Sequence, residues 1–501
     1  MKRIFPVSLI LISLLHLTGC IPNTSTQVPS TAIPEIFPDY TYVTVPSTIA
    51  PLNFTPQDTS YTAVIAEFSG TRGNSFRVKG RKNITIPKNK WTELLKANKG
   101  DSISVTLKIL KEDKWIQHTS FPIYISEHPI DHGLVYRLIA PGYELYSRMG
   151  IYQRDLQSYK QKTILVNTLL PETCMNCHSV NRGDPDFFNL HLRGSESGTI
   201  ILKDGNLEVY NTKTPETLSN CVYPYWHPSG RFIAYSVNTT RQMFPMDPGQ
   251  RIEVYDTASD IVVYDTEQNH LISSKHLTTE HFETFPAFSP DGKDLYFCVA
   301  DCKDMPQDYK EVRYALCRIS FDSETASFGT KVDTLLHAPG IHKSVTFPRP
   351  SYDGNFLTFT LADYGTFPIW HKEADIGIID LRTGEWRLME GINSPHVDSY
   401  HSWSSNSRWM VFSSRRGDGL YTRLYIAFID ENGNTGKPFL LPQKDPAKYY
   451  PETLYSFNIP EFITSPVDLD MRKIAKKTAR KTSMQWGGLK DNVPFNVPSG
   501  I

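Results

Sequence analysis

The first globular part of the chain contains short runs in which apolar residues cluster or alternate with polar ones. These runs predict β-strands at 61–68, 83–86, 102–110 and 115–125. Lys90–Asn98 places Trp91, Leu94 and Leu95 on one face and is followed by Lys99-Gly100, which predicts a short helix. Residues 41–126 are therefore expected to form a small β-sandwich-like domain.

A repeat becomes visible farther along the chain. Each copy joins two apolar runs through a turn, and the copies lie at 223–236, 285–297, 347–359 and 400–412. Segments such as Ser-Pro-Asp-Gly favour turns, so Asp291 and Asp353 are expected to form turns and not to be catalysts. Self-similar β-units of this length predict an all-β fold, with a β-propeller of six or seven blades over residues 127–465. The alternative is an open array of hairpins, which would leave sheet edges exposed.

These repeats resemble the TolB-type propeller repeat, a relative of WD repeats. The resemblance covers roughly residues 220–430 and is carried by the turns at Gly230, Gly292 and Gly354 and, in a weaker copy, at Ser407. It implies a closed ring of stacked sheets. It also implies a surface that binds peptides or lipoproteins.

The N-terminus has the pattern of an export signal. Lys2 and Arg3 precede the apolar run Val7–Leu17, which is too short to span a bilayer. The run ends in Leu17-Thr-Gly-Cys20, which resembles the lipobox of bacterial lipoproteins. Residues 1–20 are then a signal peptide and Cys20 is lipidated. The alternative is an ordinary signal peptide followed by an incidental cysteine.

The segment after the lipobox is rich in Pro, Ser and Thr, so residues 21–40 are predicted to form a flexible tether. The residues next to Cys20 are uncharged, which favours an anchor facing the periplasm. Residues 466–501 form a basic tail that contains Arg472, Lys473, Lys476 and Lys477. A tail of this kind binds an anionic surface, stays solvated, or packs on the body as a helix.

The segment Cys174-Met-Asn-Cys177-His178 has the C-x-x-C-H pattern of c-type haem attachment. Two thiols at this spacing add to the haem vinyl groups, and the adjacent histidine ligates the iron. A redox dithiol needs a helix start in a βαβ unit, and a zinc site needs further ligands; neither is visible in the sequence. We therefore predict one covalent haem c, held in an irregular loop at about 167–198.

His191 is the first choice for the sixth ligand of this haem iron, and Met149, Met243 and Met246 are alternatives. Arg193 or Arg182 is expected to pair with a haem propionate or to form a surface ion pair. Residues 181–194, together with 136–143 and 223–230, resemble a group of Bacteroidetes lipoproteins that combine TolB-type repeats with one C-x-x-C-H. This resemblance covers nearly the whole mature chain but supplies no activity. Four cysteines remain whose pairing is open: Cys221, Cys298, Cys302 and Cys317.

Composition separates the functional classes only in part. The net charge is −1, which gives no reason to expect a nucleic-acid partner. No hydrolytic motif is present. We predict a lipid-anchored periplasmic cytochrome that transfers electrons to or from a redox partner. The alternatives are an interaction scaffold or redox or ligand sensor that binds another envelope protein, and a haem enzyme with an open sixth site.

Overall fold

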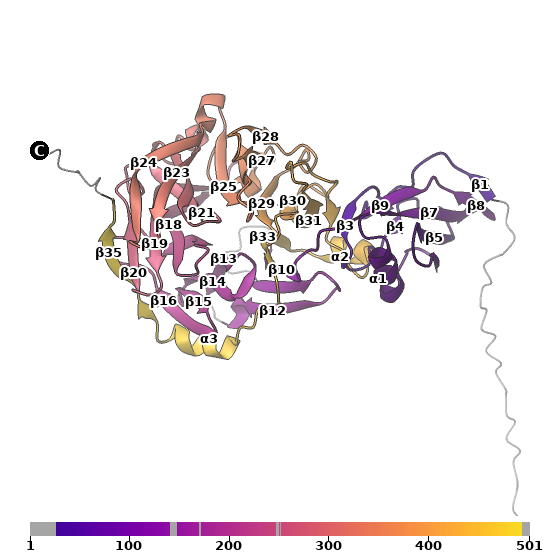
Figure 1. The fold of residues 1–501 in the computed structure, drawn as a ribbon, viewed down its shortest axis with the longest axis horizontal. Helices are drawn as coiled ribbons and strands as arrows, with labels where there is room; N and C mark the ends of the chain where they lie inside the picture. Colours follow the sequence, from indigo (N-terminus) through magenta and orange to yellow (C-terminus); the bar gives the residue numbers. More distant parts are fainter. Residues whose placement is uncertain (1–26, 141–147, 170–171, 247–249, 251, 493–501) are drawn as a thin grey trace, which may run out of the picture.

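The computed structural model describes residues 27–140, 148–169, 172–246, 250 and 252–492 (Figure 1). The predicted signal peptide and the lipidated Cys20 lie outside these residues. The predicted tether does not extend to residue 40. Gln27 already pairs with Trp115, and Ile36 and Tyr40 are buried in the core, so an ordered unit begins within the Pro-rich segment.

The N-terminal unit is one mixed sheet covered by a helix. The sheet contains β1 (Gln27–Pro29), β3 (Thr44–Pro46), β5 (Ala63–Gly70), β6 (Phe76–Gly80), β7 (Ser102–Lys111), β8 (Lys114–Gln117) and β9 (Phe121–Ser126). Helix α1 (Lys88–Ala97) buries Trp91, Leu94 and Leu95, which confirms the predicted helix. The only other sheet described in this unit pairs β2 (Ile36–Phe37) with β4 (Thr55–Pro56). The expectation of a sandwich is therefore wrong, because α1 occupies the place of a second sheet.

The remaining strands form a β-propeller (Figure 1). Four blades are separate sheets. They consist of β10 (Gly133–Ile139), β11 (Met149–Asp155), β12 (Gln161–Val166) and β33 (Ser456–Ile463); β13 (Thr173–Asn181), β14 (Asp184–Gly194), β15 (Gly198–Lys203), β16 (Asn206–Asn211) and β34 (Thr482–Ser483); β25 (Ser344–Pro350), β26 (Phe356–Ala362), β27 (Asp375–Asp380) and β28 (Trp386–Leu388); and β29 (Asp398–Trp403), β30 (Trp409–Ser414), β31 (Arg423–Phe428) and β32 (Phe439–Leu440).

The other propeller strands belong to one continuous sheet of nine strands. It contains β17 (Cys221–Trp226), β18 (Phe232–Met243), β19 (Glu253–Asp265), β20 (His270–Ser273), β21 (Phe282–Phe288), β22 (Asp294–Ala300), β23 (Ala315–Asp322), β24 (Ser327–Leu336) and β35 (Gln485–Leu489). The prediction of six or seven blades is therefore wrong: four blades are detected as separate sheets. The repeats that turn at Gly230 and Gly292 share one sheet because Ser259 of β19 pairs with Phe282 of β21.

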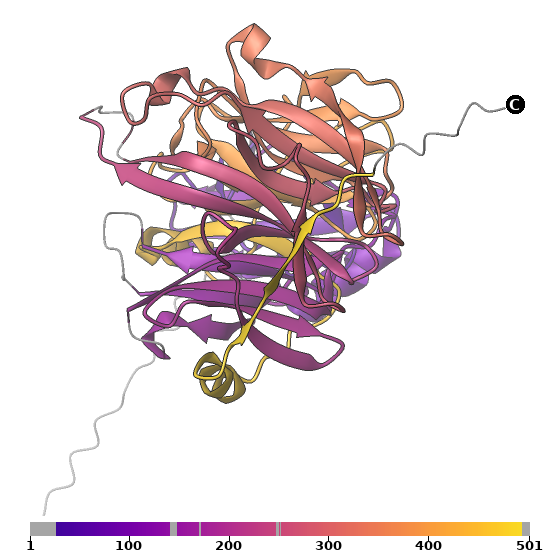
Figure 2. The same ribbon diagram turned by 90° about the vertical axis from the view of Figure 1, so that its left-hand side faces the viewer.

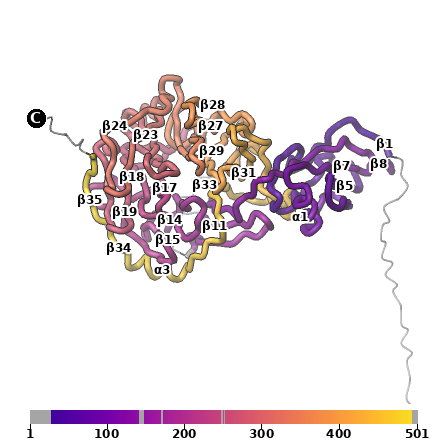
Figure 3. Tube along the Cα trace, viewed as in Figure 1, coloured from indigo at the N-terminus to yellow at the C-terminus, as the bar shows by residue number. Residues whose placement is uncertain are grey.

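The two ends of the propeller region meet in one sheet, which closes the ring. β33 comes from the C-terminal side of the sequence and pairs antiparallel with β10. The N-terminal unit packs beside this closure on the β29–β32 blade, where Tyr40 and Val43 share a core with Trp409 and Phe439. The predicted basic tail wraps the outside of the ring (Figures 2 and 3). Its helix α3 (Met471–Thr478) contacts β16, and β34 and β35 add to two sheet edges.

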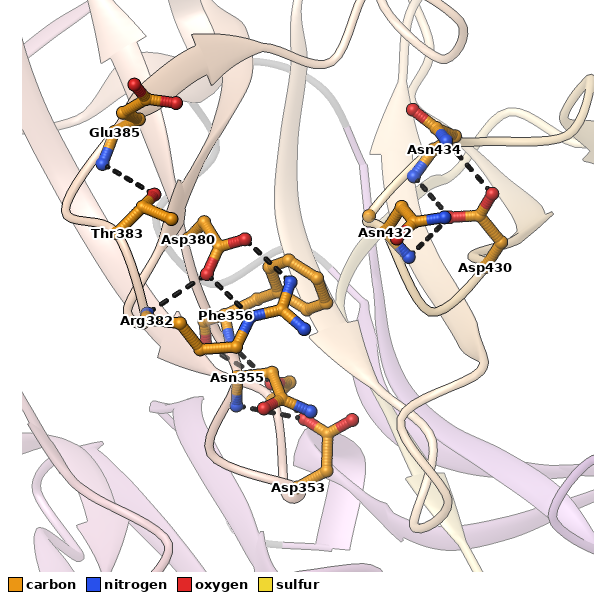
Figure 4. Close-up of polar contacts among 12 residues, drawn as sticks. Asp353, Asn355, Phe356, Asp380, Arg382, Thr383, Glu385, Asp430, Asn432 and Asn434 are labelled. Carbon is orange, nitrogen blue, oxygen red and sulfur yellow. Dashed lines mark hydrogen bonds and ion pairs between the residues drawn. The ribbon is translucent and has the colours of Figure 1, made fainter.

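Acidic side chains hold the turns between strands, as predicted (Figure 4). Asp353 accepts hydrogen bonds from Ser351 Oγ (2.6 Å) and Asn355 N (3.1 Å). Asp291 likewise accepts hydrogen bonds from Ser289 Oγ and Lys293 N. Such bonds replace backbone partners in the turn, so both carboxylates have a structural role.

Candidate functional site

The C-x-x-C-H segment forms a strand. The expectation of an irregular loop at 167–198 is therefore wrong: β13 and β14 make a long hairpin over most of it. The register between them shifts between Asn176 and His178, because Cys177 bulges out of the ladder with a φ of 58°. This bulge determines where each residue of the motif points.

The same bulge recurs in the five other strands that contact one another around the propeller axis. One residue of positive φ marks each of them: Tyr223 in β17, Phe285 in β21, Phe347 in β25, Tyr400 in β29 and Ile459 in β33. Proline follows four of these residues and histidine follows Tyr400. Cys177-His178 thus occupies the place that Phe285-Pro286 takes in the repeat. Residues 172–184 are therefore a further copy of the repeat, which an alignment of this segment with the other copies can identify and which was not predicted from the sequence.

The bulged residues occupy equivalent places in the six inner strands, and we call them the axial ring: Cys177, Tyr223, Phe285, Phe347, Tyr400 and Ile459. Ring centroids lie 4.5 Å apart for Tyr223 and Phe285, 4.3 Å for Phe285 and Phe347, and 4.8 Å for Phe347 and Tyr400. Burial raises the pKa of the Cys177 thiol, and nearby Arg193 and the backbone of Tyr223 oppose this. Cys177 therefore fills the axis as the aromatic residues do.

His178 is enclosed between two blades. Its side chain is 2% exposed and stacks on Phe188 at 6.4 Å, and neither ring nitrogen has a well-aligned hydrogen bond within the described part of the chain. Burial, with help from Arg137, lowers its pKa to about 3, although backbone groups of Val135 and Ile459 act weakly against this. His401, at the equivalent place in β29, shows the same burial and the same pKa of about 3.

His191 lies on the other face of the same sheet. His178 pairs with Leu190 across the ladder, so the next residue of β14, His191, points the opposite way. The Nδ1 atom of His191 lies 2.9 Å from Thr199 Oγ1, and burial lowers its pKa to about 3. The two histidines therefore do not face one common space.

The structure tests whether these residues fit a covalent haem. Cys174 lines a cavity, Cys177 belongs to the axial ring and His178 faces no described cavity. Of the alternative ligands, Met149 lines the same cavity as Cys174, whereas Met246 is fully exposed. Two thiols and an imidazole must converge on one haem, and here they do not. In this arrangement the residues do not fit a covalent haem, so the structure gives no support to the haem site predicted from the sequence.

A cavity of about 480 Å³, which we call the funnel, opens at the end of the axis where Cys174 lies. Its polar lining includes Arg137, Arg193, Arg241 and Arg415, and among the residues that the structure describes no carboxylate lines it. Arg193 pairs in register with Cys174 across the β13–β14 ladder, and its predicted contact with a haem propionate stays a prediction. Burial opposes the charge of Arg193, but Cys177, Tyr223 and Cys174, followed by Asp256, raise its pKa. Asn238 and Thr240 donate hydrogen bonds to the Asp256 carboxylate.

The opposite end of the axis holds a much smaller cavity of about 30 Å³. Arg182, Arg349 and Glu461 line it. Arg182 packs 5.5 Å from the ring of Tyr352, and Glu461 accepts a hydrogen bond from Val180 N at 2.6 Å. Burial raises the pKa of Glu461 to about 7 against the opposing charge of Arg349. Arg182 is therefore remote from Cys174.

The remaining cysteines are free: no disulfide joins the six cysteines in the described residues. Cys298 and Cys317 lie on neighbouring strands but one register position apart, so they face opposite sides and belong to different cores. Within the described residues, no group of three or more His, Cys, Asp or Glu is placed to hold a metal ion. The helices described there are all too short or too polar to cross a bilayer.

No protein-family model and no curated protein matches the chain. Among solved structures, TolB from Acinetobacter baumannii is 13% identical, covers 72% of this chain and 79% of its own, and has a TM-score of 0.42. The propeller domain of the Trilobed protease from Pyrococcus furiosus is 12% identical (68% and 91% covered, TM-score 0.33). Prolyl oligopeptidase B from Galerina marginata is 12% identical (60% and 44% covered, TM-score 0.35).

The sheets and their closure define this chain as a β-propeller protein. At TM-scores below 0.5, the solved structures assign it neither to a family nor to a function.

Proposed function

We propose that this chain is a binding protein of the cell envelope: an interaction scaffold or ligand sensor built on a propeller, and not an electron carrier. The single observation that carries this proposal is the funnel, a cavity of about 480 Å³ lined by four arginines and no described carboxylate. Cavities of this size that combine apolar walls with a few polar groups are typical of ligand sites. The axial ring would hold a ligand at this mouth.

The envelope location in this proposal depends on the N-terminal sequence. Lys2, Arg3, the apolar run and Cys20 support export and lipidation, with the periplasm as the expected side. A Cys20→Ala variant is expected to leave the membrane fraction. Unchanged membrane fractionation and unchanged mass would contradict the lipid anchor, and they would leave the proposed binding at the funnel unaffected.

Blocking the funnel tests the binding function. Cys174 lines the funnel, and Cys302 is the exposed cysteine on a distant loop. The full chain with Cys302→Ser would be labelled at Cys174 with a bulky maleimide. The matched control is the Cys174→Ser chain labelled at Cys302. Calorimetry would then follow binding of pooled short peptides in three classes: anionic, neutral and cationic.

We expect at least one pool to bind, and the Cys174 label to abolish this binding while the Cys302 label leaves it intact. Mass spectrometry verifies the labelled positions. Absence of binding by all three pools, or equal loss with both labels, would refute the proposal.

A further inference from the structure

Two buried residues that line the funnel have polar atoms without a partner in the described part of the chain. Arg137 is 6% exposed, its Nη1 atom donates only a long bond of 3.5 Å to Met175 O, and its Nε–H has no partner among the described residues. Asn176 is 9% exposed, and its Oδ1 atom likewise lacks a described donor. A buried polar atom left unpaired costs roughly 1–3 kcal/mol, so these atoms call for a ligand or water.

The two atoms differ in kind. The guanidinium of Arg137 donates and needs an acceptor, whereas Asn176 Oδ1 accepts and needs a donor. Arg137 contacts the backbone of Met175, the residue before Asn176, and both residues line the same cavity. A partner that satisfies both must therefore present an acceptor and an N–H or O–H close together. The C-terminal residue of a peptide does this, because its carboxylate lies next to its own backbone N–H. A fatty acid has the carboxylate but lacks the N–H.

The charge around this position favours an anion. Arg193 adds a second guanidinium at the funnel, next to Cys174 in the ladder. Arg415 lies 4.1 Å from the ring of Trp370, which orients it at the same cavity. Asp256 is the carboxylate near Arg193, and its side chain is already held by Asn238 and Thr240. Charge-assisted, bidentate contacts to a carboxylate are the strongest hydrogen bonds that arginine makes.

The rest of the lining is apolar. It includes Met149, Ile252, Val254, Phe367, Ile369 and Trp370. An apolar side chain next to the charged end of a ligand would be buried against this wall.

We infer that the funnel binds the free C-terminus of a peptide or protein whose last residue is apolar. The carboxylate contacts Arg137 and Arg193, the last backbone N–H donates to Asn176 Oδ1, and the last side chain packs on the apolar wall. This inference rests on the proposed binding function and specifies its ligand.

The experiment uses the full chain and three probes: an N-acetylated hexapeptide ending in leucine with a free carboxylate, the same peptide with an amidated end, and decanoate. Calorimetry measures each affinity. We expect the free acid to bind about tenfold or more tightly than the amide and than decanoate. Arg193→Met should weaken the acid about tenfold, and Arg137→Lys should weaken it while retaining the charge. Arg182→Met at the opposite mouth is the matched control and should change nothing.

The outcomes separate the inference from the function on which it rests. Equal binding of acid and amide, or binding of decanoate alone, would overturn the peptide C-terminus as ligand while a funnel site sensitive to the Cys174 label would still stand. Equal weakening by Arg182→Met would also overturn it. If no probe binds and no peptide pool binds, both the inference and the proposed function fail. Circular dichroism of each variant verifies that it is folded.

Discussion

The two mouths of the propeller differ in size and charge, although the same inner strands build both. The funnel measures about 480 Å³ and is lined by arginines and by no carboxylate of the described part of the chain, whereas the opposite cavity measures about 30 Å³ and sets Arg349 against Glu461. Residues before the bulge, such as Cys174 and Asn458, line the funnel. Residues after it, such as Val180 and Glu461, line the small cavity. Position relative to the bulge therefore decides which mouth a residue serves.

The axial ring separates the two mouths, and its loss should have the largest effect. Phe347 contacts Tyr223, Phe285 and Tyr400, so Phe347→Ala removes the most central ring. We expect the free energy of unfolding to fall by roughly 3–5 kcal/mol, as for other buried aromatic residues cut to alanine. Urea denaturation followed by tryptophan fluorescence measures this.

Cys177 is a small member of the same axial ring and serves as the comparison. Cys177→Ala should lower the free energy of unfolding by about 1 kcal/mol, because little side-chain volume is lost. Similar losses for Phe347→Ala and Cys177→Ala would show that the ring is not packed as described here.

The small mouth should be more sensitive to pH than the funnel. The pKa of Glu461 is raised from 4.5 to about 7 because burial disfavours its charged form. Both states bind the proton below pH 4.5, so stability is complete there. As pH rises from 4.5 to 7 the unfolded chain loses this proton first, and stability falls. The loss is about 3 kcal/mol.

Glu461→Gln keeps an acceptor for Val180 N and removes the titration. Urea midpoints of the variant and the parent should therefore lie closest at pH 4.5, diverge as the pH rises to 7, and change little relative to each other between pH 7 and 8. Parallel curves would contradict the raised pKa, since other groups such as Glu283 titrate equally in both chains.

Sequence patterns predicted the elements of the fold better than their assembly. The turn residues Asp291 and Asp353 and the helix around Trp91 follow from local spacing, and they are confirmed. The sheet boundaries do not follow from it. One bridge between Ser259 and Phe282 merges strands into a nine-stranded sheet, and α1 replaces a second sheet in the N-terminal unit. Both features depend on contacts between residues far apart in the sequence, and the spacing of apolar residues within a segment does not predict such contacts.

The funnel was not predicted from the sequence. Cys174 and Arg193 were assigned to haem binding; in the structure they are cross-strand partners and both line the funnel. The role of His178 was assigned from the pentapeptide alone, and the bulge at Cys177 was not foreseen. Arg137 and Trp370 come from other strands and turns, and only tertiary structure brings them to the same cavity.

The smallest expected effect distinguishes a structural histidine from a haem ligand. His178 and His401 occupy equivalent places after the bulge, both 2% exposed and both without a described hydrogen-bond partner. If both serve packing alone, His178→Ala and His401→Ala should each lower the free energy of unfolding by a similar, modest amount, roughly 1–2 kcal/mol.

The same two variants test the haem prediction when the chain is expressed with a cytochrome c maturation system. Because the two thiols and His178 do not converge in the structure, we expect no covalent haem stain on a denaturing gel from the parent chain or either variant. A stained parent band that disappears when Cys174 and Cys177 are both replaced by serine would show that the motif binds haem and that β13 rearranges to do so. In that case His178→Ala should also shift the visible spectrum while His401→Ala leaves it unchanged, because only His178 would lie next to the iron.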